Sequence, residues 1–270
     1  MTRVVPKCSI IIPAYNMQGT IVETLDSCIA QTTRDVEIIV VDDDSTDGTA
    51  EAAAAHAAAP QVIGIAHTGI PGAVRNVGIL AARGTYLQFL DADDIIAPEK
   101  IASQLALLDG EPAGTVAYCD YAFFTDEPEG RRLERRGPAD SDYWPEDLAG
   151  AFARYTVIHR FLFPRTLVLD AGLFDPELSH AEDLDLWLRL TIGGTRFAYQ
   201  ARALAFYREH MSHSLSAPEQ ERWCRVLVAR KVRRLIEDAG VADLYSEVMD
   251  KIEAREVEAH RASVRARSKM

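Results

Sequence analysis

Residues 86–94 read YLQFLDADD and decide the fold of this chain. The first five form an apolar run with the length and residue types of a buried strand, which stops at Asp91, Asp93 and Asp94. A helical pattern follows over residues 99–108, so the carboxylates lie where a strand ends and a loop begins. In open α/β sheets, ligands bind in the crevice outside the carboxyl ends of the strands. The cluster predicts either a cation site with hard oxygen ligands or the acidic cap of the next helix.

The same alternation of apolar runs and helical patterns precedes this stretch. We expect strands at 8–12, 36–41 and 61–66, and helices around 21–29, up to residue 59 and over 70–82. Four strand–helix alternations within about 110 residues predict a parallel sheet built from right-handed crossovers.

The rhythm changes after Gly110. We expect strands at 115–125, 195–199 and 203–207, a surface hairpin or loop over 126–142, helices at 146–155, 166–173 and 181–192, and a helical tail from residue 218 that is broken near Gly240.

Charge and composition exclude several classes of protein. The 270 residues carry 41 acidic and 29 basic side chains, a net charge of −12, which disfavours nucleic acid as a partner. An anionic substrate would need a metal or a few well-placed cationic side chains. No apolar run approaches the ~18 residues of a membrane span, and residues 1–7 lack the apolar core of a signal peptide. The four cysteines match no metal spacing, so we expect reduced, buried thiols in a cytoplasmic protein.

A second acidic cluster follows the expected strand at 36–41. Residues 42–48 read DDDSTDG, which superficially resembles a calcium loop starting at Asp43. The twelfth position of that loop would be Ala54 in place of the required glutamate, so we exclude it. One residue of 45–47 would cap the next helix. That leaves Asp42 and Asp43 unexplained at a strand end.

Four segments in order carry a resemblance. They are residues 9–16 (SIIIPAYN), 37–49 (EIIVVDDDSTDGT), 75–78 (RNVG) and 89–94 (FLDADD). In this order and spacing they resemble the family 2 glycosyltransferases, densely over residues 8–110 and more thinly to about residue 216.

The resemblance implies an α/β fold of the GT-A type, a Rossmann-like, mostly parallel sheet flanked by helices. It implies a catalytic domain at 1–216, with a nucleotide-sugar-binding half at 1–110 and an acceptor half at 111–216, followed by a C-terminal helical extension at 217–270.

The resemblance also assigns residue roles on the donor side. The donor nucleotide would contact Pro13, Ala14, Tyr15, Asp43, Arg75, Asp91 and Ala92. Asp43 would accept a hydrogen bond from the imide of uracil, and Arg75 would lie at the edge of the base pocket. Asp93, with Asp91, would bind Mn²⁺ or Mg²⁺ bridging the two phosphates. Asp44 stands where the family commonly has glycine, and aspartate tolerates the positive φ of such a turn.

On the acceptor side, the resemblance points to the acidic pair that opens the helix at 181–192. Asp183 would be the general base that deprotonates the acceptor hydroxyl, with Glu182 as the alternate. A carboxylate at a helix N-terminus has its pKa lowered by the dipole, so a capping role stays open. His210 and Ser214 resemble a segment that closes over the donor diphosphate; an ordinary polar loop is the alternative.

The expected activity is an inverting glycosyltransferase, a hexosyl- or related transferase that moves one sugar from a nucleotide-diphosphate sugar, with UDP as the expected nucleotide. The alternatives are a catalytically silent sugar-nucleotide-binding protein and a nucleotidyltransferase of related fold. The acceptor stays open among a glycan, a lipid-linked molecule and a small molecule. We expect a cytoplasmic location, with peripheral contact at the inner membrane face and a homodimer through the C-terminal helices as further options.

Overall fold

The structure is a computed structural model that describes residues 5–127, 130–136, 157–209 and 218–238, with 240, 250, 254, 256–258 and 261 further along. The described strands are β1 (Cys8–Ala14), β2 (Val36–Asp42), β3 (Gln61–Gly64), β4 (Tyr86–Phe89), β5 (Ile95–Ile96), β6 (Val116–Glu127), β7 (Gly130–Arg136), β8 (Phe161–Pro164) and β9 (Phe197–Arg208). The described helices are α1 (Ile21–Ile29), α2 (Thr49–Ala55), α3 (Pro71–Ala81), α4 (Lys100–Leu108), α6 (Arg165–Asp170), α7 (Glu182–Ile192) and α8 (Pro218–Asp238), with a 3₁₀ turn at Ile158–Arg160.

The described strands form one sheet in the order β3-β2-β1-β4-β8-β6-β9-β5, with β7 paired to β6. The first four are parallel, as predicted, and β8 joins the second half of the chain to β4 in the antiparallel sense. Because the sheet runs through both halves, the division near residue 110 stays a prediction.

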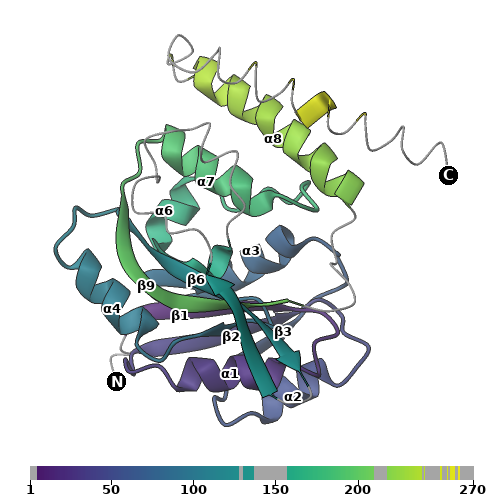
Figure 1. Cartoon of the computed structure of the whole chain (residues 1–270), viewed down its shortest axis with the longest axis vertical. Helices are drawn as coiled ribbons and strands as arrows, with labels where there is room; N and C mark the ends of the chain where they lie inside the picture. The colour runs from purple at the N-terminus through teal and green to yellow at the C-terminus, as the bar shows by residue number, and fades with distance from the viewer. Residues whose placement is uncertain are drawn as a thin grey trace.

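Helices cover both faces of the sheet (Figure 1). Helices α1 and α4 pack on one apolar face through Leu25 and Ile101, beside strand residues Ile10 and Val40. Helices α3 and α7 pack on the other face, and α8 lies against α7 as an outer layer. Successive residues of β1 alternate between the two clusters, since a strand turns its side chains to opposite faces.

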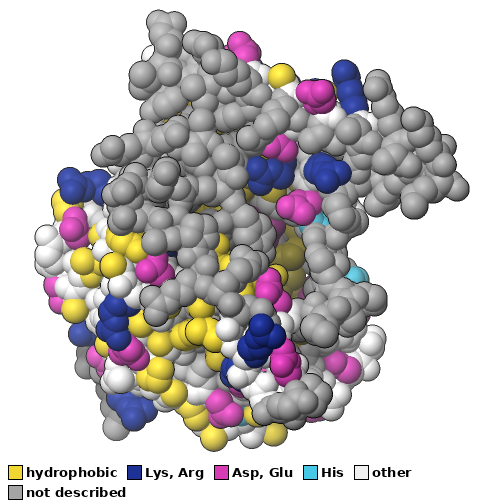
Figure 2. All heavy atoms as spheres, viewed as in Figure 1, with side chains coloured by type: hydrophobic (Ala, Val, Ile, Leu, Met, Phe, Trp, Pro, Cys, Tyr) yellow, Lys and Arg dark blue, Asp and Glu magenta, His cyan; other side chains and the backbone are white. Residues whose placement is uncertain are grey.

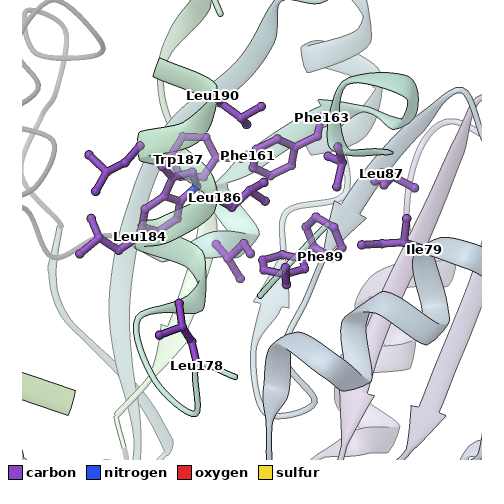
Figure 3. Close-up of a cluster of buried hydrophobic side chains, with 14 of the residues drawn as sticks. Ile79, Leu87, Phe89, Phe161, Phe163, Leu178, Leu184, Leu186, Trp187 and Leu190 are labelled. Atoms are coloured by element: carbon purple, nitrogen blue, oxygen red, sulfur yellow. The ribbon is translucent and has the colours of Figure 1, made fainter. Parts of the chain in front are cut away.

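The larger core lies between β4, β8, α3 and α7 (Figure 3). Trp187 of α7 is 2% exposed and its ring centroid lies 5.2 Å from that of Phe161. Phe89 of β4 contacts Phe163 and Phe174 at centroid distances of 5.7 and 5.1 Å. This packing fixes α7 against the strand whose C-terminal end carries the acidic cluster.

Most expected elements are present, one expectation needs correction, and one short strand is additional. The separate strands expected at 195–199 and 203–207 are one continuous strand, β9, because irregular register against β6 at Asp120 absorbs the polar interruption. The short strand β5 pairs with β9 and was not expected. The hairpin within 126–142 is confirmed for β7, whereas the helix expected at 146–155 lies outside the described residues.

All four cysteines are free and buried, as expected. Among the residues with described structure, no helix is both long and apolar enough to cross a bilayer.

The turn between α3 and β4 depends on a glycine. A Cβ atom on Gly84 would lie 2.5 Å from the backbone nitrogen of Ser9 and 2.7 Å from the carbonyl carbon of Cys8, both on the central strand β1. We expect Gly84→Ala to lower the free energy of unfolding by about 2–3 kcal/mol, because backbone has to move. Urea unfolding measures this loss. Gly64→Ala is the control, since a Cβ there meets nothing within 4 Å, and equal losses in both variants would contradict the prediction.

Candidate active site

The parallel strands bring three predicted site segments to one edge of the sheet. Ala14 at the end of β1 is paired with Asp42 at the end of β2, and the backbone nitrogen of Asp43 donates to the Ala14 carbonyl at 2.9 Å. On the other side of β1, the nitrogen of Leu90 donates to Ile11, which places Asp91 just beyond the same edge. The predicted nucleotide and metal segments are therefore neighbours in space.

Asp43 holds the loop between β3 and α3. Its buried carboxylate accepts hydrogen bonds from the backbone nitrogens of Thr68 and Gly69 at 2.7 and 2.9 Å. His67 Nδ1 lies 2.9 Å from the Asp43 carbonyl, and its ring stacks on Tyr15 at 4.3 Å between centroids. Pro13 and Ala14 belong to β1 itself. The predicted bond from Asp43 to a uracil imide stays a prediction, because two backbone amides already occupy this carboxylate.

Asp42 is a candidate that the sequence left without a role. Its side chain is 6% exposed, and Oδ2 accepts a hydrogen bond from the nitrogen of Ser45 at 3.1 Å. The other oxygen, Oδ1, is buried and has no hydrogen-bond partner among the described residues. A buried acceptor without a donor is costly, so this oxygen indicates a place where a ligand N–H or O–H is received. The position of Asp42 as the last residue of β2 was the available signal.

The neighbouring turn is as predicted at Asp44, whose φ of 63° lies in the left-handed region that aspartate tolerates. The N-cap expected among residues 45–47 was wrong, because Gly48 is the N-cap residue of α2 and makes no side-chain cap bond. Asp47 precedes it, and its Oδ1 accepts from the nitrogen of Thr49 at 2.9 Å.

The loop after β4 carries the predicted metal ligands. The Asp91 side chain is 34% exposed, Asp93 is half-buried, and Ala92 between them is buried in the core cluster on the α1 side. Two carboxylates cannot by themselves complete the coordination shell of a metal ion. No group of three or more His, Cys, Asp or Glu side chains that could hold a metal occurs among the described residues. This fits Mg²⁺ or Mn²⁺, which is commonly held by one or two carboxylates together with substrate phosphates.

Asp94 does not cap the following helix, which corrects the capping alternative for this residue. Glu99 is the N-cap residue of α4, with no side-chain cap bond. Asp94 is 1% exposed, Oδ1 accepts from the backbone nitrogen of Arg208 at 2.8 Å, and Oδ2 lies 3.1 Å from His159 Nδ1. Burial raises the pKa of Asp94 to about 6, although His159 opposes the shift. Asp94 thus fixes the acidic loop to the end of β9.

Arg75 joins the loop after β4 to the start of α7. Its guanidinium is 5% exposed and donates through Nη2 to Asp91 Oδ1 at 2.7 Å and through Nη1 to Glu182 Oε1 at 2.5 Å. The two carboxylates raise the pKa of Arg75 against the opposing effect of burial. Both terminal nitrogens of Arg75 are used in these two bonds. The predicted position of Arg75 at the edge of the nucleotide-base pocket stays a prediction.

The next residue reinforces this junction. Asn76 Nδ2 donates to the Phe174 carbonyl at 2.8 Å, and Asn76 Oδ1 accepts from the Phe174 nitrogen at 3.0 Å. Gly72 lies one turn earlier, and a Cβ there would come within 3.1 Å of Glu182 Cγ. Helix α3 therefore holds the start of α7 by close contact as well as by charge.

The acidic pair at the start of α7 divides into two environments. Glu182 is buried and bonded to Arg75. Asp183 is half-buried, and its Oδ1 accepts from the nitrogen of Leu184 at 2.7 Å. Desolvation, together with the adjacent Glu182 charge, raises the pKa of Asp183 to about 7. The expected lowering by the helix dipole was wrong, because burial and like charge exceed it.

His210 and Ser214 lie outside the described residues. Trp187, four residues beyond Asp183, is a core side chain.

Comparison with known proteins adds the family. The sequence model described as "Glycosyl transferase family 2" matches residues 9–167, more than half of the chain. The chain belongs to glycosyl transferase family 2. The matched range contains the loops after β1, β2 and β4 as well as Arg75, whereas α7 and α8 lie beyond it.

Several similar proteins are named as glycosyltransferases. An uncharacterised glycosyltransferase of Rickettsia prowazekii is 32% identical over 189 residues, 68% of this chain, and the chain spans 58% of that relative's length. The Rhizobium meliloti succinoglycan biosynthesis protein ExoO is 31% identical, covering 75% of this chain and 61% of ExoO. The Escherichia coli β-1,3-glucosyltransferase WfaP, named for UDP-Glc and a diphosphoundecaprenol-linked GlcNAc, is 31% identical, covering 75% of this chain and 77% of WfaP.

Solved structures agree with the fold. Staphylococcus aureus TarS 1-349 in complex with UDP-GlcNAc matches with a TM-score of 0.70 and 25% identity, over 95% of this chain and 73% of that one. The Pyrobaculum calidifontis mannosyltransferase PcManGT, in complex with GDP-Man and Mn²⁺, matches with a TM-score of 0.64 and 20% identity, over 95% and 75%. The GT-A-type fold is therefore confirmed.

The raised pKa of Asp183 has a consequence for stability. The unfolded state loses this proton near pH 3.8 and the folded state near pH 7, so the carboxyl destabilises the fold increasingly as pH rises from 4 to 7. We expect Asp183→Asn to raise the free energy of unfolding at pH 8 by on the order of 1–2 kcal/mol, allowing for water at this half-buried group, with little gain at pH 4.

Denaturant unfolding at both pH values measures the difference. Asp170→Asn, at an exposed position on α6, is the control and should change little at either pH. An equal effect of Asp183→Asn at pH 4 and pH 8 would contradict the assignment.

Proposed function

We propose that the chain is an inverting glycosyltransferase that moves one sugar from a nucleotide-diphosphate sugar to an acceptor hydroxyl, with Asp183 as general base. The observation that carries this proposal is the double ion pair of Arg75. One guanidinium contacts Asp91 after β4 and Glu182 beside Asp183, at 2.7 and 2.5 Å. The loop after β4 and the Asp183 carboxylate are therefore held close to each other by Arg75. Displacement at a single carbon requires that donor and general base lie this close.

The donor nucleotide is assigned to the edge formed by β1 and β2. Tyr15 is 41% exposed and offers an aromatic surface to a base. The buried Oδ1 of Asp42 suits the imide N–H of uracil, which is the donor it otherwise lacks. UDP is the preferred nucleotide in this proposal, supported by the TarS complex and the name of WfaP. Asp43 would contribute indirectly, by holding the loop between β3 and α3 beside the nucleotide.

Asp91 and Asp93 would hold Mn²⁺ or Mg²⁺ with the donor phosphates. When bound, the cation neutralises charge that develops on the departing diphosphate. This role suits a chain with a net charge of −12, which by itself would repel a diphosphate. His210 and Ser214 are kept as candidates for contact with the same phosphates.

Asp183 removes the proton from the acceptor hydroxyl. The acceptor oxygen then attacks the anomeric carbon from the face opposite the diphosphate, which inverts the configuration at that carbon. A pKa of about 7 is well matched to a base that works near neutral pH. Glu182 is the weaker candidate, because its carboxylate is bonded to Arg75. The proposed acceptor is a hydroxyl of a sugar carried on a lipid diphosphate, by analogy with WfaP, at the inner membrane face.

The metal assignment is tested by turnover. We expect Asp93→Ala to lower release of the nucleotide from its sugar donor by at least about 100-fold, because charge on the leaving group is no longer offset. The measurement is UDP release from UDP-Glc and UDP-GlcNAc with Mn²⁺ or Mg²⁺. Asp109→Ala, at the exposed end of α4, is the control. Undiminished turnover in Asp93→Ala would remove the metal from the proposal.

The assignment of UDP as the donor nucleotide is tested by binding. We expect UDP with Mn²⁺ to raise the melting temperature, because a ligand that binds only the native state stabilises it, and GDP and dTDP to raise it less. Asp42→Asn should weaken UDP binding about tenfold, because the amide can keep the Ser45 bond only by turning its NH₂ toward the ligand.

Asp35→Asn, exposed at the opposite end of β2, is the matched control for UDP binding. A larger shift with GDP would overturn the nucleotide, and full UDP affinity in Asp42→Asn would overturn the role of Asp42.

A further inference from the structure

Helix α8 is part of the unit that carries the proposed base, although it lies beyond the residues matched by the family. Its buried residues Cys224, Val228 and Val232 belong to the same apolar cluster as Leu184 and Leu188 of α7. In Figure 1 the helix lies across the outer side of α7, and Figure 2 shows acidic and basic side chains side by side in this upper region of the surface. The contact between the two helices includes charge as well as apolar area, since Lys231 of α8 lies beside Asp185 of α7.

One cation of α8 reaches the first turn of α7. Lys231 Nζ lies 2.7 Å from Asp175 Oδ2 and 2.9 Å from Asp185 Oδ1. Asp185 is fully buried, and Arg189 contacts its Oδ2 through Nε and Nη2 at 2.8 and 2.7 Å. The buried carboxylate of Asp185 is thus held by two cations from two helices.

The same cluster fixes the chain that leads into α7. Arg189 donates through Nη2 to the Leu173 carbonyl at 2.7 Å and through Nη1 to the Ala171 carbonyl. Asp175, the second partner of Lys231, follows Phe174, whose backbone is bonded to Asn76. Lys231 therefore closes a network that extends from α8 through the loop before α7 to α3.

Helix geometry relates this network to Asp183. Two positions along an α-helix correspond to a rotation of about 200° about the helix axis, so the two side chains point to nearly opposite sides. Asp185 faces α8, and Asp183 therefore faces away from α8. Anchoring Asp185 fixes the rotation and axial place of the turn that presents Asp183. Loss of Lys231 would leave Asp185 with one cation, which loosens this turn and adds uncompensated negative charge two residues from the base.

We propose that Lys231 is a positioning residue for the Asp183 base, acting through the buried carboxylate of Asp185. This inference rests on the proposed function. Lys231 touches neither donor nor acceptor in this assignment; it sets the orientation and charge environment of the group that does.

The test compares Lys231→Met with the wild type. We expect kcat for UDP release from the preferred UDP-sugar, with water as acceptor, to fall about tenfold. The reason is that a displaced Asp183 carboxylate is no longer aligned with the attacking oxygen. The KM for the donor should stay within about twofold, since the donor residues lie on other elements. The rising limb of the pH–rate profile should move up by about half a unit, because added negative charge raises the pKa of a carboxylate.

Three further variants separate positioning from folding. Lys231→Arg should restore most of kcat, because a cation returns to the same helix position. Arg234→Met, at an exposed site on α8, should leave kcat and the pH profile unchanged. The double variant Lys231→Met/Asp185→Asn should recover much of the pH shift, because removing one cation and one anion returns the net charge of this cluster to its wild-type value.

A lower melting temperature in Lys231→Met with unchanged kcat and pH profile would overturn the positioning role. If Lys231→Met does not fold, the pH profile of Asp185→Asn in the Lys231→Arg background decides in its place: an unchanged profile overturns the inference. A wild type without turnover on any nucleotide sugar would count against the proposed function itself, which distinguishes the two failures.

Discussion

The site depends on a buried arginine shared by two carboxylates. Arg75 has almost no exposure, so desolvation of its charge is unfavourable unless anions compensate it closely. Asp91 and Glu182 supply those anions from opposite sides, one on the loop after β4 and one on α7. Because one guanidinium makes both ion pairs, the loop after β4 and the start of α7 are fixed together. The neighbouring Asp183 is then left with burial and like charge, which raise its pKa.

A second buried polar layer supports the sheet beneath the site. Lys100 is fully buried, and its ammonium donates to the side-chain oxygens of Gln88 and Gln104, both uncharged. Burial lowers the pKa of Lys100 to about 8. Gln88 and Gln104 in turn donate to the carbonyls of His159 and Arg160. This layer connects β4 and α4 to the segment that precedes β8, and so joins the two halves of the sheet by directed bonds.

Local patterns predicted the first half of the fold well. Apolar runs at β1, β2 and β4 mark buried parallel strands, and the acidic residues after β2 and β4 mark the edge of the candidate site. The pattern failed where distant partners decide the outcome. The Asp94 carboxylate bonds to Arg208, 114 residues away, which no local cue reveals. The pKa of Asp183 depends on burial created by tertiary packing, so helix position alone gave the wrong direction. Asp42 and Asp43 are adjacent acids whose different partners follow from the strand end and the loop after β3.

The clamp between Asn76 and the Phe174 backbone limits how such enzymes can be recombined. Two reciprocal hydrogen bonds and the close approach of Gly72 to Glu182 make α3 and residues 174–182 one fitted surface. A chimera that takes its first half from one family member and its second half from another would have to carry both sides of this surface from the same parent. The natural unit of exchange is therefore not the sequence half but the residues that meet across it, although they lie about 100 positions apart along the chain.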